Sequence, residues 1–121
     1  MVKTFGLTHI SLAVRDPERS LQFYSAVFGV KEYFRDDSSI QAIGPSGKDI
    51  LAFERKPENA GKIGGVEHFG FRLTTPEDIE EAISTVEAAG GILLRRGEFS
   101  VGFPYAYVAD PDGYEIEIWY E

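Results

Sequence analysis

The sequence repeats itself once, and this repeat limits the possible folds more than any other feature. His9 and His68 are 59 residues apart, and so are Pro17 and Pro76. Each proline begins a stretch of helical periodicity, and each histidine lies in a strand-like stretch before it. A repeat of this length predicts two similar units that bury their apolar faces against each other.

Each unit is predicted to run strand, helix and three strands. Asp16 and Thr75 are the expected helix N-caps, because each precedes a proline at the first helical position. The predicted strands cover 5–14, 31–35, 40–44 and 49–54, then 67–74, 92–96, 104–110 and 114–120. The polar stretch 56–65, which holds three glycines, is the predicted linker. We therefore expect a single domain over 1–121, with a first module over about 5–55 and a second over about 66–121.

Two histidines and one glutamate stand out within this pattern. His9, His68 and Glu117 each alternate with apolar residues that should pack under the helices, so all three should project from the opposite face of the sheet. Two imidazoles and one carboxylate on one face predict a metal site with open positions for substrate. These donors suit one divalent ion, Fe²⁺, Mn²⁺, Ni²⁺ or Zn²⁺. The alternative is that each is an ordinary strand surface residue.

Other side chains on the same predicted face are candidates for catalysis or substrate binding. Glu54 is the candidate general base if desolvation raises its pKa. Arg72 can pair with a substrate carboxylate or, equally, form a salt bridge to Glu54 or Glu115. The aromatic residues can line the site or simply pack in the core. The candidate substrate-binding residues are Ser11, Arg72, Tyr105, Tyr107, Glu115 and Trp119.

Composition excludes several classes of partner and site. The net charge of −8 disfavours binding to nucleic acid or to an anionic membrane. The absence of cysteine removes disulfides, thiolate metal sites and cysteine nucleophiles. No apolar run approaches the ~20 residues of a membrane span. We expect a cytoplasmic protein that binds a small molecule.

Several motifs together resemble the vicinal oxygen chelate superfamily, which includes glyoxalase I, bleomycin-resistance proteins and extradiol dioxygenases. The motifs are THISLAV at 8–14, FY at 23–24 with FG at 28–29, EHFGF at 67–71 and DPDGYEIEI at 110–118. The resemblance implies an α+β fold in which two βαβββ modules form a cupped, eight-stranded mixed sheet around one metal ion. It also implies a homodimer. If the modules pair across subunits, His9 of one chain would join His68 and Glu117 of the other; pairing within one chain is the alternative.

Departures from individual families narrow the expected reaction. Glyoxalase I has a fourth ligand at the position that the repeat gives to Ala52, although Glu54 lies two residues further on the same face. Extradiol dioxygenases use a further histidine, and this chain has two in all. We therefore expect a metal-dependent enzyme with glyoxalase-like lyase or isomerase chemistry. The alternatives are a bleomycin-resistance-like binding protein without catalysis and a ring-cleaving dioxygenase.

Overall fold

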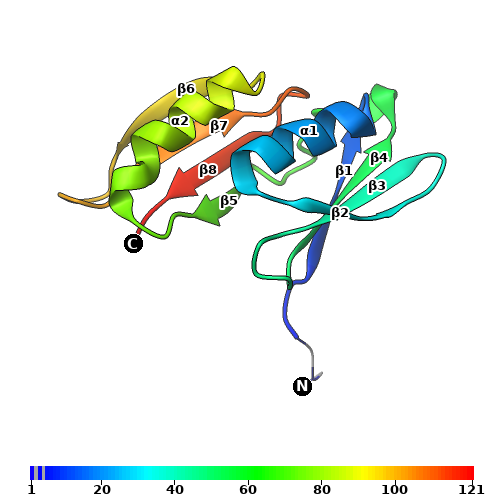
Figure 1. Cartoon of the computed structure of the whole chain (residues 1–121), viewed down its shortest axis with the longest axis horizontal. Helices are drawn as coiled ribbons and strands as arrows, with labels where there is room; N and C mark the ends of the chain where they lie inside the picture. The colour runs from blue at the N-terminus through cyan, green and yellow to red at the C-terminus, as the bar shows by residue number, and fades with distance from the viewer. Residues whose placement is uncertain (2, 4) are drawn as a thin grey trace.

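The chain folds into two modules with the same order of elements (Figure 1). The computed structural model describes residues 1, 3 and 5–121. The first module holds β1 (His9–Val14), α1 (Pro17–Phe28), β2 (Lys31–Arg35), β3 (Ser39–Ile43) and β4 (Ile50–Arg55). The second holds β5 (Phe69–Arg72), α2 (Ile79–Ala88), β6 (Ile92–Glu98), β7 (Pro104–Ala109) and β8 (Glu115–Trp119). Short 3₁₀ helices, η1 (Pro57–Asn59) and η2 (Pro76–Asp78), lie in the linker and before α2.

Each module forms its own four-stranded sheet. The strand orders are β1-β4-β3-β2 and β5-β8-β7-β6, so the two sheets have equivalent topology. In each, the first strand pairs parallel with the last, and the other pairs are antiparallel. The predicted α+β fold of two βαβββ modules is therefore confirmed. Within one chain the eight strands lie in two sheets of four, with β1 and β5 each at a sheet edge.

The ends of the helices are set largely by capping residues that the sequence already indicates. The Asp16 side chain accepts a hydrogen bond from the Glu18 N–H, and Gly29 ends α1 with a left-handed φ of 68°. Thr75 holds the predicted N-cap position before Pro76, with an extended backbone, but its side chain makes no capping hydrogen bond. Instead the first turn tightens into η2, and α2 begins at Ile79.

Several strands differ in length from their predicted ranges. The strand expected over 5–14 begins at His9, and the one expected over 67–74 is limited to Phe69–Arg72. The strand expected over 92–96 continues to Glu98, since it pairs with β7 as far as Pro104. Strand length depends on available pairing partners, which local periodicity does not report.

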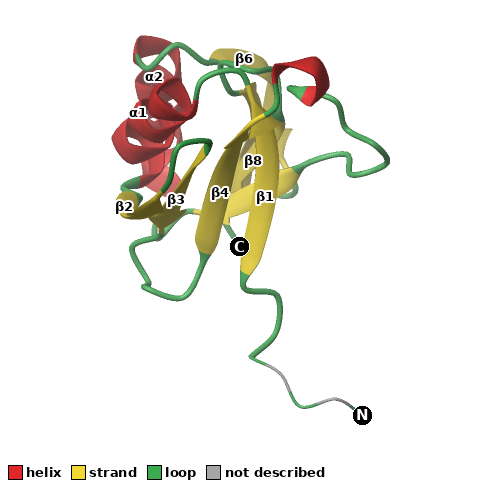
Figure 2. Cartoon of the chain, turned by 90° about the vertical axis from the view of Figure 1, so that its right-hand side faces the viewer, coloured by secondary structure: helices red, strands yellow, loops and turns green. Residues whose placement is uncertain are grey.

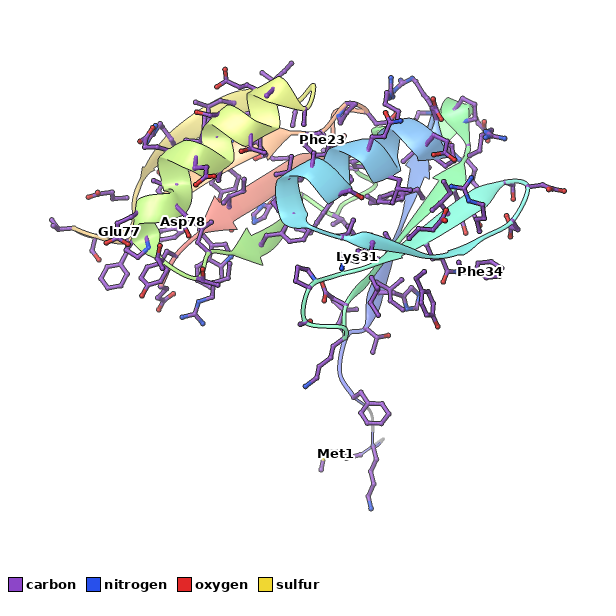
Figure 3. All side chains as sticks on the ribbon, viewed as in Figure 1. Met1, Phe23, Lys31, Phe34, Glu77 and Asp78 are labelled. Atoms are coloured by element: carbon purple, nitrogen blue, oxygen red, sulfur yellow. The ribbon has the colours of Figure 1, made fainter. Side chains whose placement is uncertain are left out.

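The two helices cover one side of both sheets, as Figure 2 shows. Phe23, labelled in Figure 3, is 1% exposed on α1. Tyr24 stacks against Phe69 of the second module, and the rings of Phe28 and Phe71 lie 3.7 Å apart. One core therefore spans both modules, and the opposite faces of the sheets are left for function. In the part of the chain that the structure describes, no helix has the length and apolar character to cross a bilayer.

A buried carboxylate joins α1 to the second module. Asp112, in the turn between β7 and β8, has a side chain that is 0% exposed. Its Oδ1 accepts hydrogen bonds from the Arg15 N–H at 3.1 Å and from Arg19 Nη2 at 2.9 Å. Arg15 Nη1 and the Ser20 hydroxyl also donate to this carboxylate. Because all four donor groups belong to three residues of the first module, the contact fixes one module on the other.

A second set of hydrogen bonds extends this connection. The Tyr24 hydroxyl donates to Asp110 Oδ2 at 2.8 Å, and the Tyr114 hydroxyl donates to the Ala13 carbonyl at 2.7 Å. Burial raises the pKa of Asp110, although the hydrogen bond from Tyr24 lowers it. Burial and the nearby carboxylates also raise the pKa of Tyr24 well above its usual range. The contacts of Asp110 and Asp112 with α1 and the end of β1 are called the module latch below.

Candidate metal centre

The expected alternation is present in β8. Ile116 and Ile118 are buried in the core under the helices, whereas Glu117 points to the other face with a side chain that is 16% exposed. Glu117 pairs in register with Gly70 on one side and Tyr107 on the other. Glu117 is therefore placed at the centre of the face that is free of helices.

His68 and Glu117 converge on this face. His68 Nε2 lies 3.3 Å from Glu117 Oε2. Two ligand atoms about 2.1 Å from one cation lie roughly 3.0–3.4 Å apart for bond angles between about 90° and 110°. The two donor atoms are thus already spaced as neighbouring ligands of a single ion, and imidazole with carboxylate suits the expected metals.

Tyr107 supports this pair from the next strand. Its hydroxyl donates to Glu117 Oε1 at 3.0 Å, which leaves Oε2 facing His68. Its ring meets the His68 ring edge-on, with centroids 5.2 Å apart. Burial raises the pKa of Tyr107, and the hydrogen bond to Glu117 raises it further. Tyr107 therefore stays protonated and orients the carboxylate, as groups behind metal ligands commonly do.

The structure does not bring His9 to this pair within one chain. His9 is exposed on β1 of the other module, with Nδ1 3.3 Å from the Thr8 hydroxyl. It lines a small cavity of about 140 Å³ beside Gly70 and Phe71. Among the described residues, no group of three or more His, Cys, Asp or Glu side chains is placed to hold a metal ion. A single chain therefore offers two of the three expected donors.

Ser11 and Glu115 lie near His68. All three line a cavity of about 350 Å³ between β1, the start of β5 and the linker. Most of the other lining residues are apolar, including Ile63 and Val66 of the linker. This cavity gives a small molecule access to His68 from the side of the first module.

Glu54 occupies the expected face of β4 but is tied to a neighbour. Its Oε2 lies 3.1 Å from Lys56 Nζ, and its side chain is 41% exposed. It stands beside Ala13 in the register with β1, two residues beyond Ala52. In the single chain Glu54 is therefore a half-exposed partner of Lys56.

The remaining predicted residues form an aromatic patch at one end of the face. Arg72 donates to the main-chain oxygen of Glu121 and lies over the Trp119 ring at 5.5 Å. It pairs with neither Glu54 nor Glu115, so neither expected salt bridge is present. Tyr105 packs against Tyr107, with centroids 5.7 Å apart, and against Phe99. Tyr105 and Trp119 thus line the same face as Glu117.

Sequence reasoning missed Arg95. This residue pairs with Glu115, and its guanidinium carbon lies 4.0 Å from the centroid of the Tyr107 ring. A register shift between Leu93 and Arg95 brings Arg95 opposite Tyr107. The alternation of the segment is a signal for a strand, but it does not reveal this irregularity.

Comparisons with known proteins agree with this architecture. Residues 6–118 match the model of the Glyoxalase/Bleomycin resistance protein/Dioxygenase superfamily. A probable lactoylglutathione lyase of Synechocystis is 32% identical over 127 residues, which cover 93% of this chain and 92% of that protein. A catechol-2,3-dioxygenase of Bacillus subtilis is 29% identical over 93% of this chain, and the match covers only 41% of the dioxygenase. The fosfomycin resistance protein FosX of Listeria monocytogenes has the same fold, with a TM-score of 0.82 at 18% identity, over 98% of this chain and 93% of that one.

Proposed function

Because the chain belongs to the Glyoxalase/Bleomycin resistance protein/Dioxygenase superfamily, we propose that it is a metal-dependent enzyme with lyase or isomerase chemistry. Its substrate is a small molecule that binds through oxygen atoms. The observation that carries the proposal is the 3.3 Å approach of His68 Nε2 to Glu117 Oε2, with Tyr107 hydrogen-bonded behind Glu117. The name of the Synechocystis relative favours a lyase.

The third donor is His9 of a second copy, so the active form is a homodimer. The module latch fixes one module on the other, and among the described residues His9 does not join His68 and Glu117 of the same chain in a group that could hold a metal ion. Strands β1 and β5 each end a sheet, and an edge strand offers unpaired N–H and C=O groups to a second chain. Joining β1 of one copy to β5 of the other brings the missing imidazole to the pair.

The chemistry follows from the residues around the pair. His9, His68 and Glu117 would hold the divalent ion, which would supply Lewis-acid stabilisation of negative charge on a substrate oxygen. Tyr107 fixes Glu117 in the ligating orientation through its 3.0 Å hydrogen bond. Glu54 is the candidate base, and it acts from the module that donates His9 once Lys56 releases it.

Substrate contacts come from the same face. Ser11 and Glu115 line the cavity next to His68, and Tyr105, Tyr107 and Trp119 provide an aromatic wall. Rigid aromatic side chains bury a substrate at a small entropic cost and exclude water from the reacting atoms.

Mixing two inactive variants tests the cross-subunit site. His9→Ala and His68→Ala homodimers each lack a ligand in every site, so both should fail to bind metal tightly. A mixed dimer has one site with both lesions and one intact site if ligands come from different chains. After random exchange of subunits, about a quarter of all sites should regain metal and activity. Pairing within one chain would restore none.

Metal analysis tests the function itself. Protein purified without chelators or a metal-affinity tag should carry one divalent ion per chain, and His68→Ala should lose it. Well-folded protein that ignores added Mn²⁺, Fe²⁺, Ni²⁺ and Zn²⁺ would contradict the proposal. It would favour the alternative of a binding protein whose acidic groove holds a cationic ligand.

A further inference from the structure

Arg95 lies one aromatic ring away from the proposed metal ligands. Arg95 on β6, Tyr107 on β7 and Glu117 on β8 are consecutive partners across the sheet, so they form one row on the same face. The guanidinium carbon of Arg95 is 4.0 Å from the Tyr107 ring centroid, and the Tyr107 hydroxyl donates to Glu117. Strands are about 4.8 Å apart, so this row places the guanidinium within roughly 10 Å of Glu117.

The guanidinium is held so that it can receive a ligand. Stacking on the ring fixes its plane, while its N–H groups point outward along its edges. Glu115 Oε1 pairs with Nη2. The side chain of Arg95 is 56% exposed, so a small molecule on this face of the sheet can reach the remaining N–H groups. A planar fork of this kind suits two oxygen atoms of a carboxylate or phosphate.

Arg96, the next residue along β6, forms an ordinary surface ion pair and serves as a comparison for Arg95. Arg96 points to the opposite face and pairs with Glu80 of α2. That pair is also exposed, but it stacks on no ring that contacts Glu117. The two arginines are therefore a natural comparison, since they share a strand and a type of partner and differ in the face they serve.

We propose that Arg95 binds an oxyanion group of the substrate, a carboxylate or a phosphate, and that Glu115 is the counterion this group displaces. The inference rests on the proposed function, because it places the anionic group beside the metal-bound end of the same molecule. The substrate is then a small acid with a second oxygen function within roughly 10 Å of its anionic group. The net charge of −8 disfavours diffuse attraction of anions, so any binding reports a local site.

The test measures anion binding to metal-free protein at low salt, with inorganic phosphate and succinate as probes. Titrations followed by NMR of arginine side-chain N–H signals compare wild type with Arg95→Gln, Glu115→Gln and Arg96→Gln. Arg95→Gln should abolish binding, and Glu115→Gln should tighten it about fivefold, because the competing charge is gone. Arg96→Gln should match wild type.

Opposite effects at Arg95 and Glu115 distinguish a ligand site from a structural ion pair. If Glu115→Gln weakens binding, if Arg95→Gln and Arg96→Gln behave alike, or if no protein binds either probe, the proposal is wrong. Urea unfolding of each variant separates a lost site from a lost fold. Mn²⁺ binding is measured in parallel: anion binding without metal binding would contradict the proposed function alone, and metal binding without anion binding would contradict the role of Arg95 alone.

Discussion

Replacing the buried Asp112 by alanine should destabilise the protein more than removing the carboxylate of any exposed ion pair. The side chain is 0% exposed and accepts hydrogen bonds from two arginines, one main-chain N–H and one hydroxyl. All of these donors come from the first module, so the substitution weakens the whole contact between the modules.

The magnitude follows from the environment of the partners. Removing one member of a buried ion pair costs about 3–5 kcal/mol when the other charge stays buried. Here the side chains of Arg15 and Arg19 are 52% and 41% exposed, so water can solvate the guanidinium groups once Asp112 is gone. The lost charge-assisted hydrogen bonds then dominate, and we expect a loss of about 2–3 kcal/mol.

Urea unfolding followed by circular dichroism measures this loss. Asp36→Ala is the matched control, because Asp36 also accepts hydrogen bonds from the Ser38 and Ser39 N–H groups but lies in an exposed turn. The control should lose clearly less stability than Asp112→Ala. Equal losses in the two variants, or a loss below about 1 kcal/mol for Asp112→Ala, would refute a buried latch.

Three further changes test the site and the module boundary. Tyr107→Phe removes the hydrogen bond to Glu117 and should weaken metal binding about tenfold in a Mn²⁺ titration, with no large change in unfolding. Gly61→Ala should lower the free energy of unfolding by about 2 kcal/mol more than Gly64→Ala, as measured by urea unfolding. Both glycines have positive φ, but a Cβ at residue 61 would lie 2.4 Å from the main-chain carbonyl oxygen of Asp112. Because the pKa of Tyr24 is raised well above its usual value in the folded protein, the neutral phenol stabilises the fold fully below pH ~10 and this contribution is lost as the pH rises further. Tyr24→Phe should therefore flatten the fall of the urea midpoint above pH ~10.

Local sequence signals were sufficient wherever the structure depends on neighbours along the chain. The repeat of His9 and Pro17 at His68 and Pro76 predicted two equivalent modules, and period-two alternation placed Glu117 and His68 on the same face. These features arise from backbone geometry, which fixes which side chains share a face before any tertiary contact is known.

The latch could not be predicted in this way. The turn at 110–113 was evident from its proline and glycine, but the partners of its carboxylates lie 86 to 97 residues earlier in the chain. The sequence pattern shows that Asp112 lies in a turn. It does not show that Arg15 and Arg19 of the other module donate hydrogen bonds to its carboxylate. The register shift that brings Arg95 opposite Tyr107 could not be predicted for a similar reason, because it depends on pairing between strands.

The latch also bears on why the histidines of the two modules do not meet within one chain. If the modules were free to rotate, β1 and β5 could pair in the same chain and bring His9 to His68. With Asp112 buried against the start of α1, such a rotation would break the hydrogen bonds from Arg15, Arg19 and Ser20 together. Association with a second copy leaves these bonds intact and still joins the edges of two sheets. On this reasoning the same contact that stabilises the single chain favours a site built from two chains, and weakening it should raise the fraction of monomer that binds metal by itself.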